Sequence, residues 1–147
     1  MARLLLINGP NLNLLGQREP ELYGCATLEQ IETRLVQLAQ ERSHELLCYQ
    51  NDAEHELLKR IHQARDENIE LILFNPAAFT HTSIVLRDAL LAVGVPFIEI
   101  HLSNVAARED FRQQNFFSDI AIGTVAGFGI TSYELALIAA ERYLGAI

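Results

Sequence analysis

"RLLLINGPNLNLLGQREPELYG", residues 3–24, places a short apolar run directly before a long polar segment. The apolar run "RLLLI" is typical of a buried strand. The segment that follows it is longer than the about 2 to 6 residues that usually join a strand to a helix in a compact α/β domain. Longer connections of this kind are usually binding loops or lids. The stretch therefore predicts a strand that leads into a functional loop.

Strand-like runs and helical patterns alternate through the rest of the chain. "TLEQIETRLVQLAQERS", residues 27–43, begins with Thr27 and Gln30, which form a capping box, and carries an apolar stripe at helical spacing. A helix that ends at Gly94 is expected to be capped at its start by Thr82 or Ser83. Further strands are predicted at 44–50, 70–76, 95–103 and 119–127, and further helices at 53–67, 82–94 and 131–145.

This alternation indicates an α/β fold. Five strands with continuous apolar runs, each followed by a crossover helix, favour a parallel sheet that is covered on both faces. The expected arrangement is a flavodoxin-like, doubly wound sheet with strand order 2-1-3-4-5. The chain of 147 residues suits one domain, residues 1–147, with one core. In the last helix, the side chains expected to pack are Leu135, Leu137, Ile138 and Ala139.

Composition excludes several classes of partner. The formal net charge of −8 provides no basic face for a nucleic acid or an anionic membrane surface. The first apolar run is too short for a signal peptide or a membrane span. Cys25 and Cys48 stand far apart and are typical of unpaired thiols in a reducing compartment. We therefore expect a soluble, cytoplasmic protein without nucleic-acid or membrane partners.

Several familiar catalytic motifs are absent from the sequence. Neither G-x-x-x-x-G-K-[ST] nor G-x-G-x-x-G follows a strand, and "GFGITS", residues 127–132, is better explained as a tight turn into the last helix. Lys59, the only lysine, lies within a predicted helix away from every strand end, which disfavours a Schiff base. The sequence also lacks a histidine-rich metal spacing. No metal or organic cofactor is expected.

Polar residues follow the strands at the edge where parallel α/β sheets bind ligands. His101 ends the fourth strand in "IEIHLSN", and Glu99, two residues earlier, points to the same side of the sheet. Such a carboxylate can select the imidazole tautomer and make the histidine a general acid. The alternative is a buried histidine with a structural carboxylate. His44, His55 and His62 are interpreted as surface residues.

Proton abstraction needs a base, and the opening loop offers Tyr23. A phenol is a poor base at neutral pH unless a cation stabilises its anion, and Arg18 in the same loop could do so. Tyr23 could equally pack the loop onto the sheet. In "FNPAAFTHTS", Asn75 and His81 resemble orienting groups for a hydroxylated or carboxylated substrate, although a turn and a helix entry would also explain them.

Four segments in this order and spacing resemble the type II 3-dehydroquinate dehydratases: "NGPNLNLLGQREPELYG", "NPAAFTHTS", "IEIHLSN" and "AREDFR". The resemblance covers essentially the whole chain. It implies removal of water from 3-dehydroquinate to give 3-dehydroshikimate through an enolate, without metal or cofactor, in the shikimate and quinate pathways. The sequence departs from the family at Ala106, where His is common, and at Ser132, where Gly is common.

The resemblance also implies roles in proton transfer. Tyr23 would take a proton from C2, and Arg18 would stabilise the phenolate. Asn11 would help to hold the enolate oxygen through an ordered water. His101, held by Glu99, would protonate the departing C1 hydroxyl.

Other residues match the family's substrate contacts. Asn75 and the backbone N–H groups of Leu102 and Ser103 would hold the substrate carboxylate. His81 and Arg112 would contact the ring hydroxyls.

The resemblance further implies an assembly and a lid. Asp88 would reach into the site of a neighbouring subunit, in a dodecamer built as four trimers. The loop at about residues 12–26 would close over the substrate. The alternative class is a flavodoxin-like module that binds a small molecule at the same strand ends.

Overall fold

The computed structural model describes residues 1–17, 19, 21 and 24–145. Its strands form one five-stranded parallel sheet with order β2-β1-β3-β4-β5, which confirms the predicted flavodoxin-like arrangement. The strands are β1 (Arg3–Asn8), β2 (Glu45–Gln50), β3 (Leu71–Asn75), β4 (Phe97–His101) and β5 (Gly123–Ala126). The α-helices are α2 (Leu28–Glu41), α3 (Glu54–Asp66), α4 (Ile84–Val93) and α5 (Thr131–Tyr143). Short 3-10 helices follow three of the strands, at Leu12–Leu14, Ala77–His81, Val105–Ala107 and Asp110–Arg112.

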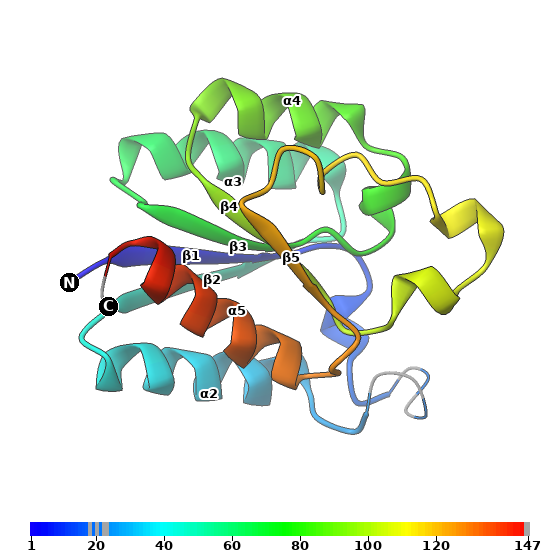
Figure 1. Ribbon diagram of the computed structural model, residues 1–147, viewed down its shortest axis with the longest axis horizontal. Helices are drawn as coiled ribbons and strands as arrows, with labels where there is room; N and C mark the ends of the chain where they lie inside the picture. The colour runs from blue at the N-terminus through cyan, green and yellow to red at the C-terminus, as the bar shows by residue number, and fades with distance from the viewer. Residues whose placement is uncertain (18, 20, 22–23, 146–147) are drawn as a thin grey trace.

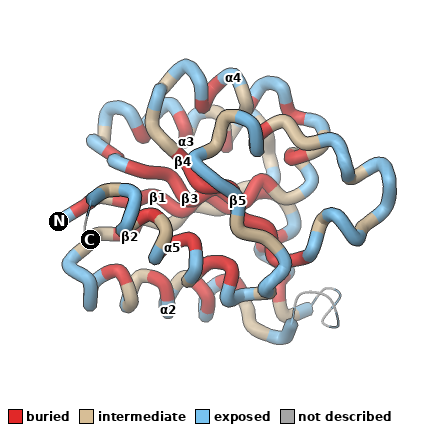
Figure 2. Tube along the Cα trace, in the orientation of Figure 1, coloured by how far each residue is buried: buried red, intermediate tan, exposed pale blue. Residues whose placement is uncertain are grey.

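Helices cover both faces of the sheet, with α2 and α5 on one side and α3 and α4 on the other (Figure 1). Strand β1 lies inside the sheet between β2 and β3, and successive side chains of a strand point to opposite faces. Leu4 and Leu6 therefore join the core against α2 and α5, whereas Leu5 and Ile7 join the core against α3 and α4. Figure 2 shows the buried strands β1, β3 and β4 between the partly exposed helices. In the described part of the chain, no helix is both long and apolar enough to cross a membrane.

The helix ends follow local rules. The capping box at α2 is present, with Thr27 Oγ1 accepting from Gln30 N at 3.2 Å and Gln30 Oε1 accepting from Thr27 N at 3.0 Å. Of the two candidates before α4, Ser83 is the cap, because its hydroxyl accepts from Leu86 N at 3.0 Å. Gly94 ends α4 at φ 69°, a left-handed conformation that favours glycine.

The predicted inward face of α5 is partly wrong. Leu135 and Ile138 are each 37% exposed, whereas the buried positions of the helix are Ser132, Tyr133, Ala136, Leu137 and Ala140. The rotation of the helix follows Tyr133, whose buried hydroxyl needs hydrogen-bond partners that only the sheet provides. The small alanines on the same face let the helix approach the sheet closely.

The interpretation of His44 as a surface residue is also wrong. Its side chain is only 10% exposed, because both ring nitrogens are hydrogen-bonded within the protein. Nδ1 accepts from the backbone N–H of Ala2 at 3.1 Å, and Nε2 lies 3.0 Å from a carboxylate oxygen of Glu141 on α5. His44 thus ties the start of β1 to α5, at the amino edge of the sheet.

Candidate active site

A pocket of about 70 Å³ opens at the carboxyl ends of β1, β3 and β4. This is the edge where ligands of open parallel sheets bind. The structure brings seven of the predicted site residues to the wall of this pocket: Asn11, Asn75, His81, His101, Leu102, Ser103 and Arg112. Its other lining residues are Pro10, Leu12, Leu15, Ala77, Ala78, Val105 and Arg108.

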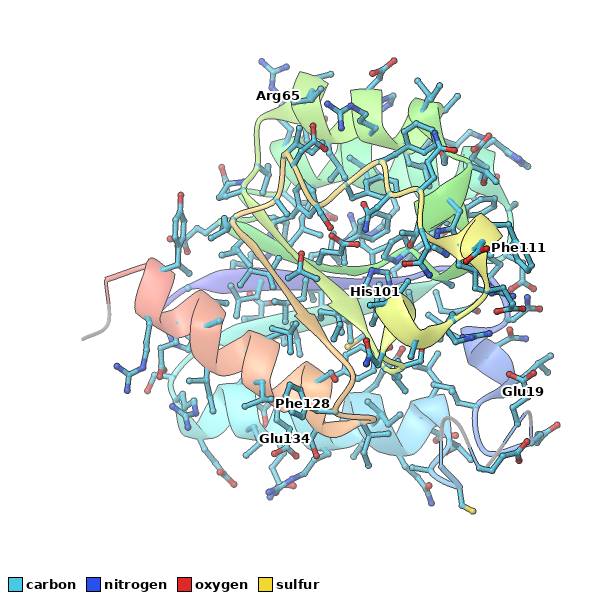
Figure 3. The ribbon with its side chains drawn as sticks, turned by 45° about the vertical axis from the view of Figure 1, so that its right-hand side comes forward. Glu19, Arg65, His101, Phe111, Phe128 and Glu134 are labelled. Carbon is cyan, nitrogen blue, oxygen red and sulfur yellow. The ribbon has the colours of Figure 1, made fainter. Side chains whose placement is uncertain are left out.

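His101 and Glu99 form a close pair at the end of β4. Nε2 of His101 lies 2.5 Å from Oε2 of Glu99, and the carboxylate is fully buried. The alternation of side chains along β4 puts both on one side of the strand, as the sequence predicts. Because a carboxylate oxygen accepts, Nε2 carries a proton and Nδ1 is left as the other nitrogen of a ring that lines the pocket. Figure 3 labels His101 at the end of β4.

Three further side chains donate to Glu99. Asn115 Nδ2 lies 2.6 Å from its Oε2, and Thr124 Oγ1 lies 3.1 Å from its Oε1. The Ser118 hydroxyl donates to the same Oε1. Burial raises the pKa of Glu99, but the hydrogen bond and charge of His101 and the bonds from Ser118 and Asn115 outweigh it, so the pKa lies below the usual range. Glu99 is therefore a buried carboxylate that stays ionised.

Asn115, Ser118 and Thr124 were not predicted from the sequence as part of the site. These side chains come from the segment before β5 and from β5 itself, which pairs with β4 at Glu99↔Thr124. Strand pairing was the available signal, since a residue paired with Glu99 in a neighbouring strand lies beside it. The register, however, could not be read from the sequence.

The first turn of the opening loop is pressed against the loop after β3. A Cβ added to Gly9 would lie 2.5 Å from the Pro76 carbonyl oxygen, so this close approach requires glycine. Asn11 adopts φ 68°, which asparagine tolerates better than most residues, and its backbone N–H donates to Asp52 Oδ1 at 3.0 Å. The side chain of Asn11 thus reaches the pocket from an ordered turn.

Asn75 is held on two sides at the end of β3. Its Oδ1 accepts from Ala77 N at 3.2 Å, and its Nδ2 donates to the Tyr133 hydroxyl at 2.9 Å. Asn75 thus shapes the turn around Pro76, as one of the two explanations predicts, and it also lines the pocket. Ala77 stands at φ 52°, a strained conformation for a residue with a side chain.

His81 and Ser103 lie at the pocket wall with partners behind them. Nδ1 of His81 is 2.7 Å from the Gln114 carbonyl oxygen. A carbonyl only accepts, so Nδ1 carries the proton and the neutral ring has its lone pair at Nε2. Ser103 Oγ accepts from Arg108 Nη1 at 3.3 Å. Nε2 of His81 can therefore accept from a ligand hydroxyl, and the Ser103 hydroxyl can donate to a hydroxyl or carboxylate oxygen.

Two guanidinium groups stand at the rim of the pocket. Arg112 Nε lies 2.8 Å from Glu109 Oε1, and Arg108 Nε lies 3.4 Å from the same oxygen. A backbone hydrogen bond, then the bond from Arg112, hold the pKa of the exposed Glu109 below its usual range. Arg112 also stacks on Phe111, with 5.1 Å from its Cζ to the ring centre. This rim suits an anionic or hydroxylated ligand.

Among the described residues, two of the predicted site residues do not line the pocket: Glu99, which is hydrogen-bonded to His101, and Asp88. Asp88 lies on the exposed face of α4. The proposed base Tyr23 and its cation Arg18 lie outside the described residues. Between residues 1–17, at 19 and 21, and over 24–145, no group of three His, Cys, Asp or Glu side chains could hold a metal ion.

A doubly wound parallel sheet with a small polar pocket at its carboxyl edge defines the class as flavodoxin-like α/β proteins with a ligand site at the strand ends. The chain belongs to a particular family within this class, the class II dehydroquinases, whose sequence profile matches residues 2–141.

Curated relatives and solved structures agree with this family. The chain is 60% identical to the 3-dehydroquinate dehydratase of Hahella chejuensis over 140 residues, covering 95% of each. It is 59% identical to 3-dehydroquinate dehydratase 1 of Pseudomonas aeruginosa, covering 98% of each. The crystal structure of type II dehydroquinase from Propionibacterium acnes matches with a TM-score of 0.92 and 40% identity over 97% of each chain. The alternative of a flavodoxin-like binding module is not favoured.

Proposed function

We propose that the protein is a 3-dehydroquinate dehydratase, a hydro-lyase that converts 3-dehydroquinate into 3-dehydroshikimate and water. The family supports the reaction. The observation that carries the proposal is the His101–Glu99 pair, placed at a pocket whose wall also presents Asn75, His81 and Arg112. A histidine hydrogen-bonded to a buried carboxylate, beside convergent oxygen-binding groups, suits proton transfer to a polyhydroxylated acid.

The acid half of the reaction belongs to His101. The C1–O bond of the enolate intermediate breaks as electrons move from the enolate to form the C1–C2 double bond. The departing hydroxyl takes a proton from the imidazolium and leaves as water. Glu99, which holds Nε2 at 2.5 Å, stabilises the imidazolium before transfer and leaves Nδ1 as the donor.

The base half belongs to Tyr23. Its phenolate takes the C2 proton, and Arg18 stabilises that phenolate. Both assignments come from the family resemblance, since these residues lie outside the described part of the chain. Asn11, which lines the pocket, helps to hold the enolate oxygen through a bound water.

The remaining contacts orient the substrate. Asn75 and the backbone N–H groups of Leu102 and Ser103 bind its carboxylate, and His81 and Arg112 bind its ring hydroxyls. All five residues lie around one pocket, which supports a single substrate pose. The loop of residues 12–26 closes over this pocket and excludes water during the reaction.

We further propose a dodecamer of four trimers in which Asp88 completes a neighbouring site. Asp88 lies on an α4 surface that also exposes Ile84 (55%), Val85 (46%) and Leu91 (55%). Exposed apolar side chains around a carboxylate are consistent with a subunit contact. Asp88→Asn is expected to raise KM without unfolding the subunit. The free thiols Cys25 and Cys48 support a cytoplasmic location.

The proposed reaction is tested by the ultraviolet absorbance of the conjugated enone after 3-dehydroquinate is added to the protein. Chelator-treated and borohydride-treated samples are measured beside an untreated one. Equal turnover in all three is expected, because the proposed route uses neither a metal nor a Schiff base. No turnover in any sample would refute the proposal.

A further inference from the structure

A buried chain of hydrogen bonds runs behind the pocket and joins three elements. Ala77 N donates to Asn75 Oδ1 at 3.2 Å, Asn75 Nδ2 donates to Tyr133 Oη at 2.9 Å, and Tyr133 Oη donates to Asn8 Oδ1 at 2.6 Å. Asn8 and Tyr133 are fully buried, and Asn75 is 2% exposed. This series of hydrogen bonds thus links the ends of β1 and β3 to α5. Because the three side chains are buried, water does not compete for these bonds.

Ala77 sets the direction of this chain. A backbone N–H only donates, so the Asn75 atom that faces it must be the amide oxygen. The amide nitrogen of Asn75 then faces Tyr133, whose oxygen must accept. The hydroxyl proton of Tyr133 is left to go to Asn8 Oδ1. The reverse orientation would place two donors face to face at Ala77, which a buried site does not tolerate.

The surroundings of Asn8, at the other end of this hydrogen-bond series, require the same donor-to-acceptor direction. Asn8 presents its oxygen to Tyr133, so its Nδ2 must point elsewhere, and this buried nitrogen has no partner at normal hydrogen-bond distance among the described residues. Burial raises the pKa of Glu32 on α2, and the side chain of Asn8 partly offsets this by favouring the ionised carboxylate. A carboxylate beside Asn8 accepts hydrogen bonds, as this direction demands.

The orientation of Asn75 has a consequence for the pocket that it lines. An amide nitrogen carries two protons, and Asn75 gives one of them to Tyr133. Because Asn75 also lines the pocket, its second N–H can be given to a ligand oxygen. We propose that Tyr133 is a positioning residue that holds the Asn75 amide as a hydrogen-bond donor to the substrate carboxylate, an inference that rests on the proposed function.

The test compares Tyr133→Phe with Tyr143→Phe, a matched loss of a hydroxyl on the same helix at a 54% exposed position. Tyr133→Phe leaves the Asn75 amide nitrogen without its acceptor, so that the 3.2 Å bond from Ala77 N to its oxygen holds the side chain alone. We expect KM to rise by about 10- to 30-fold, the cost of one unsatisfied or misdirected hydrogen bond, while kcat changes by less than about threefold. Tyr143→Phe should leave both constants unchanged.

A double-mutant cycle separates positioning from stability. Asn75→Ala should raise KM strongly in the wild type and have little further effect in Tyr133→Phe, because the contact is already lost. Additive effects, or a Tyr133→Phe enzyme with a lower Tm and an unchanged KM, would overturn the inference.

A second variant covers the case in which Tyr133→Phe does not fold. Asn8→Leu removes the acceptor of the Tyr133 proton, so this proton and the Asn75 amide N–H oppose each other and the amide is no longer held in one orientation between Ala77 and Tyr133. KM should rise as in Tyr133→Phe, and an unchanged KM would count against the inference. A wild-type protein that does not turn over 3-dehydroquinate at all would refute the proposed function instead, and a crystal structure of Tyr133→Phe would then show whether the Asn75 side chain has turned.

Discussion

Two histidine–glutamate pairs, one buried and one partly buried, lie at opposite edges of the sheet, and the buried pair borders the pocket. His101 is bonded to Glu99 at one ring nitrogen and lines the pocket. His44 is bonded at both ring nitrogens, to Ala2 and to Glu141. Proximity of an imidazole to a carboxylate therefore does not by itself indicate catalysis. The two histidines differ in the second ring nitrogen, which is bonded to Glu141 in His44 but in His101, among the described residues, belongs to a ring that lines the pocket.

The largest effect is expected from His101→Ala. Loss of a general acid typically lowers the rate by about 10²- to 10⁴-fold. We expect kcat, measured from the enone absorbance, to fall within this range, while circular dichroism shows an intact fold. Substrate binding should suffer less than in Asn75→Ala. A His101→Ala enzyme with wild-type turnover would remove the distinction between the two histidines.

Glu99→Gln should have the next largest effect, because it keeps the size of the side chain and removes its charge. The imidazolium of His101 then loses its charged partner, and the introduced amide can turn its nitrogen toward Nε2. We expect kcat to fall by about 10²-fold, at the lower end of the contribution of acid catalysis. Glu141→Gln is the matched control, and steady-state assays should show its kcat unchanged. Equal losses in both variants would contradict the account.

His44→Ala should affect stability and leave activity alone. The variant deletes the acceptor of the Ala2 N–H, which costs about 1 kcal/mol in the free energy of unfolding for this bond alone. Urea denaturation measures this change, and kcat/KM should stay within about twofold of the wild type. A large loss of activity at unchanged stability would show that the amino edge of the sheet takes part in catalysis.

The smallest effect concerns acid stability. The pKa of Glu99 is lower in the folded protein than its usual value of about 4.3. The ionised Glu99 therefore stabilises the folded protein fully at a pH above its usual pKa. This stabilisation is lost as the pH falls through the lower pKa of the folded state. The free energy of unfolding is measured for the wild type and for Glu99→Gln. The difference between the two proteins should shrink as the pH is lowered in this range. A difference that grows toward low pH would contradict the direction of the shift.

The sequence predicted those parts of the fold and site that depend on near neighbours. Alternation within β4 was enough to place Glu99 and His101 on one side, and the capping box of α2 needed only Thr27 and Gln30. Polar residues after the strands were found because parallel strands end at a common edge. The pocket could therefore be anticipated before its geometry was known.

Contacts between distant residues could not be predicted in this way. Tyr133 meets Asn75 across 58 positions, and His44 meets Glu141 across 97. Neither partner leaves a periodic signal in the sequence. The error in α5 has the same origin, since a count of apolar residues gives no weight to a hydroxyl that must find partners in the sheet. The hydrogen bonds that Asn115, Ser118 and Thr124 donate to Glu99 depend on how β5 and the segment before it lie against β4.

The central claim is that His101 delivers a proton to the leaving hydroxyl and does not remove the proton from C2. The most direct test follows the exchange of the C2 hydrogen of 3-dehydroquinate in D₂O, by mass spectrometry of recovered substrate, for His101→Ala and Tyr23→Phe. The account predicts that His101→Ala exchanges this hydrogen without forming product and that Tyr23→Phe does neither. Exchange that persists in Tyr23→Phe and is lost in His101→Ala would contradict it, because the roles of acid and base would then be reversed.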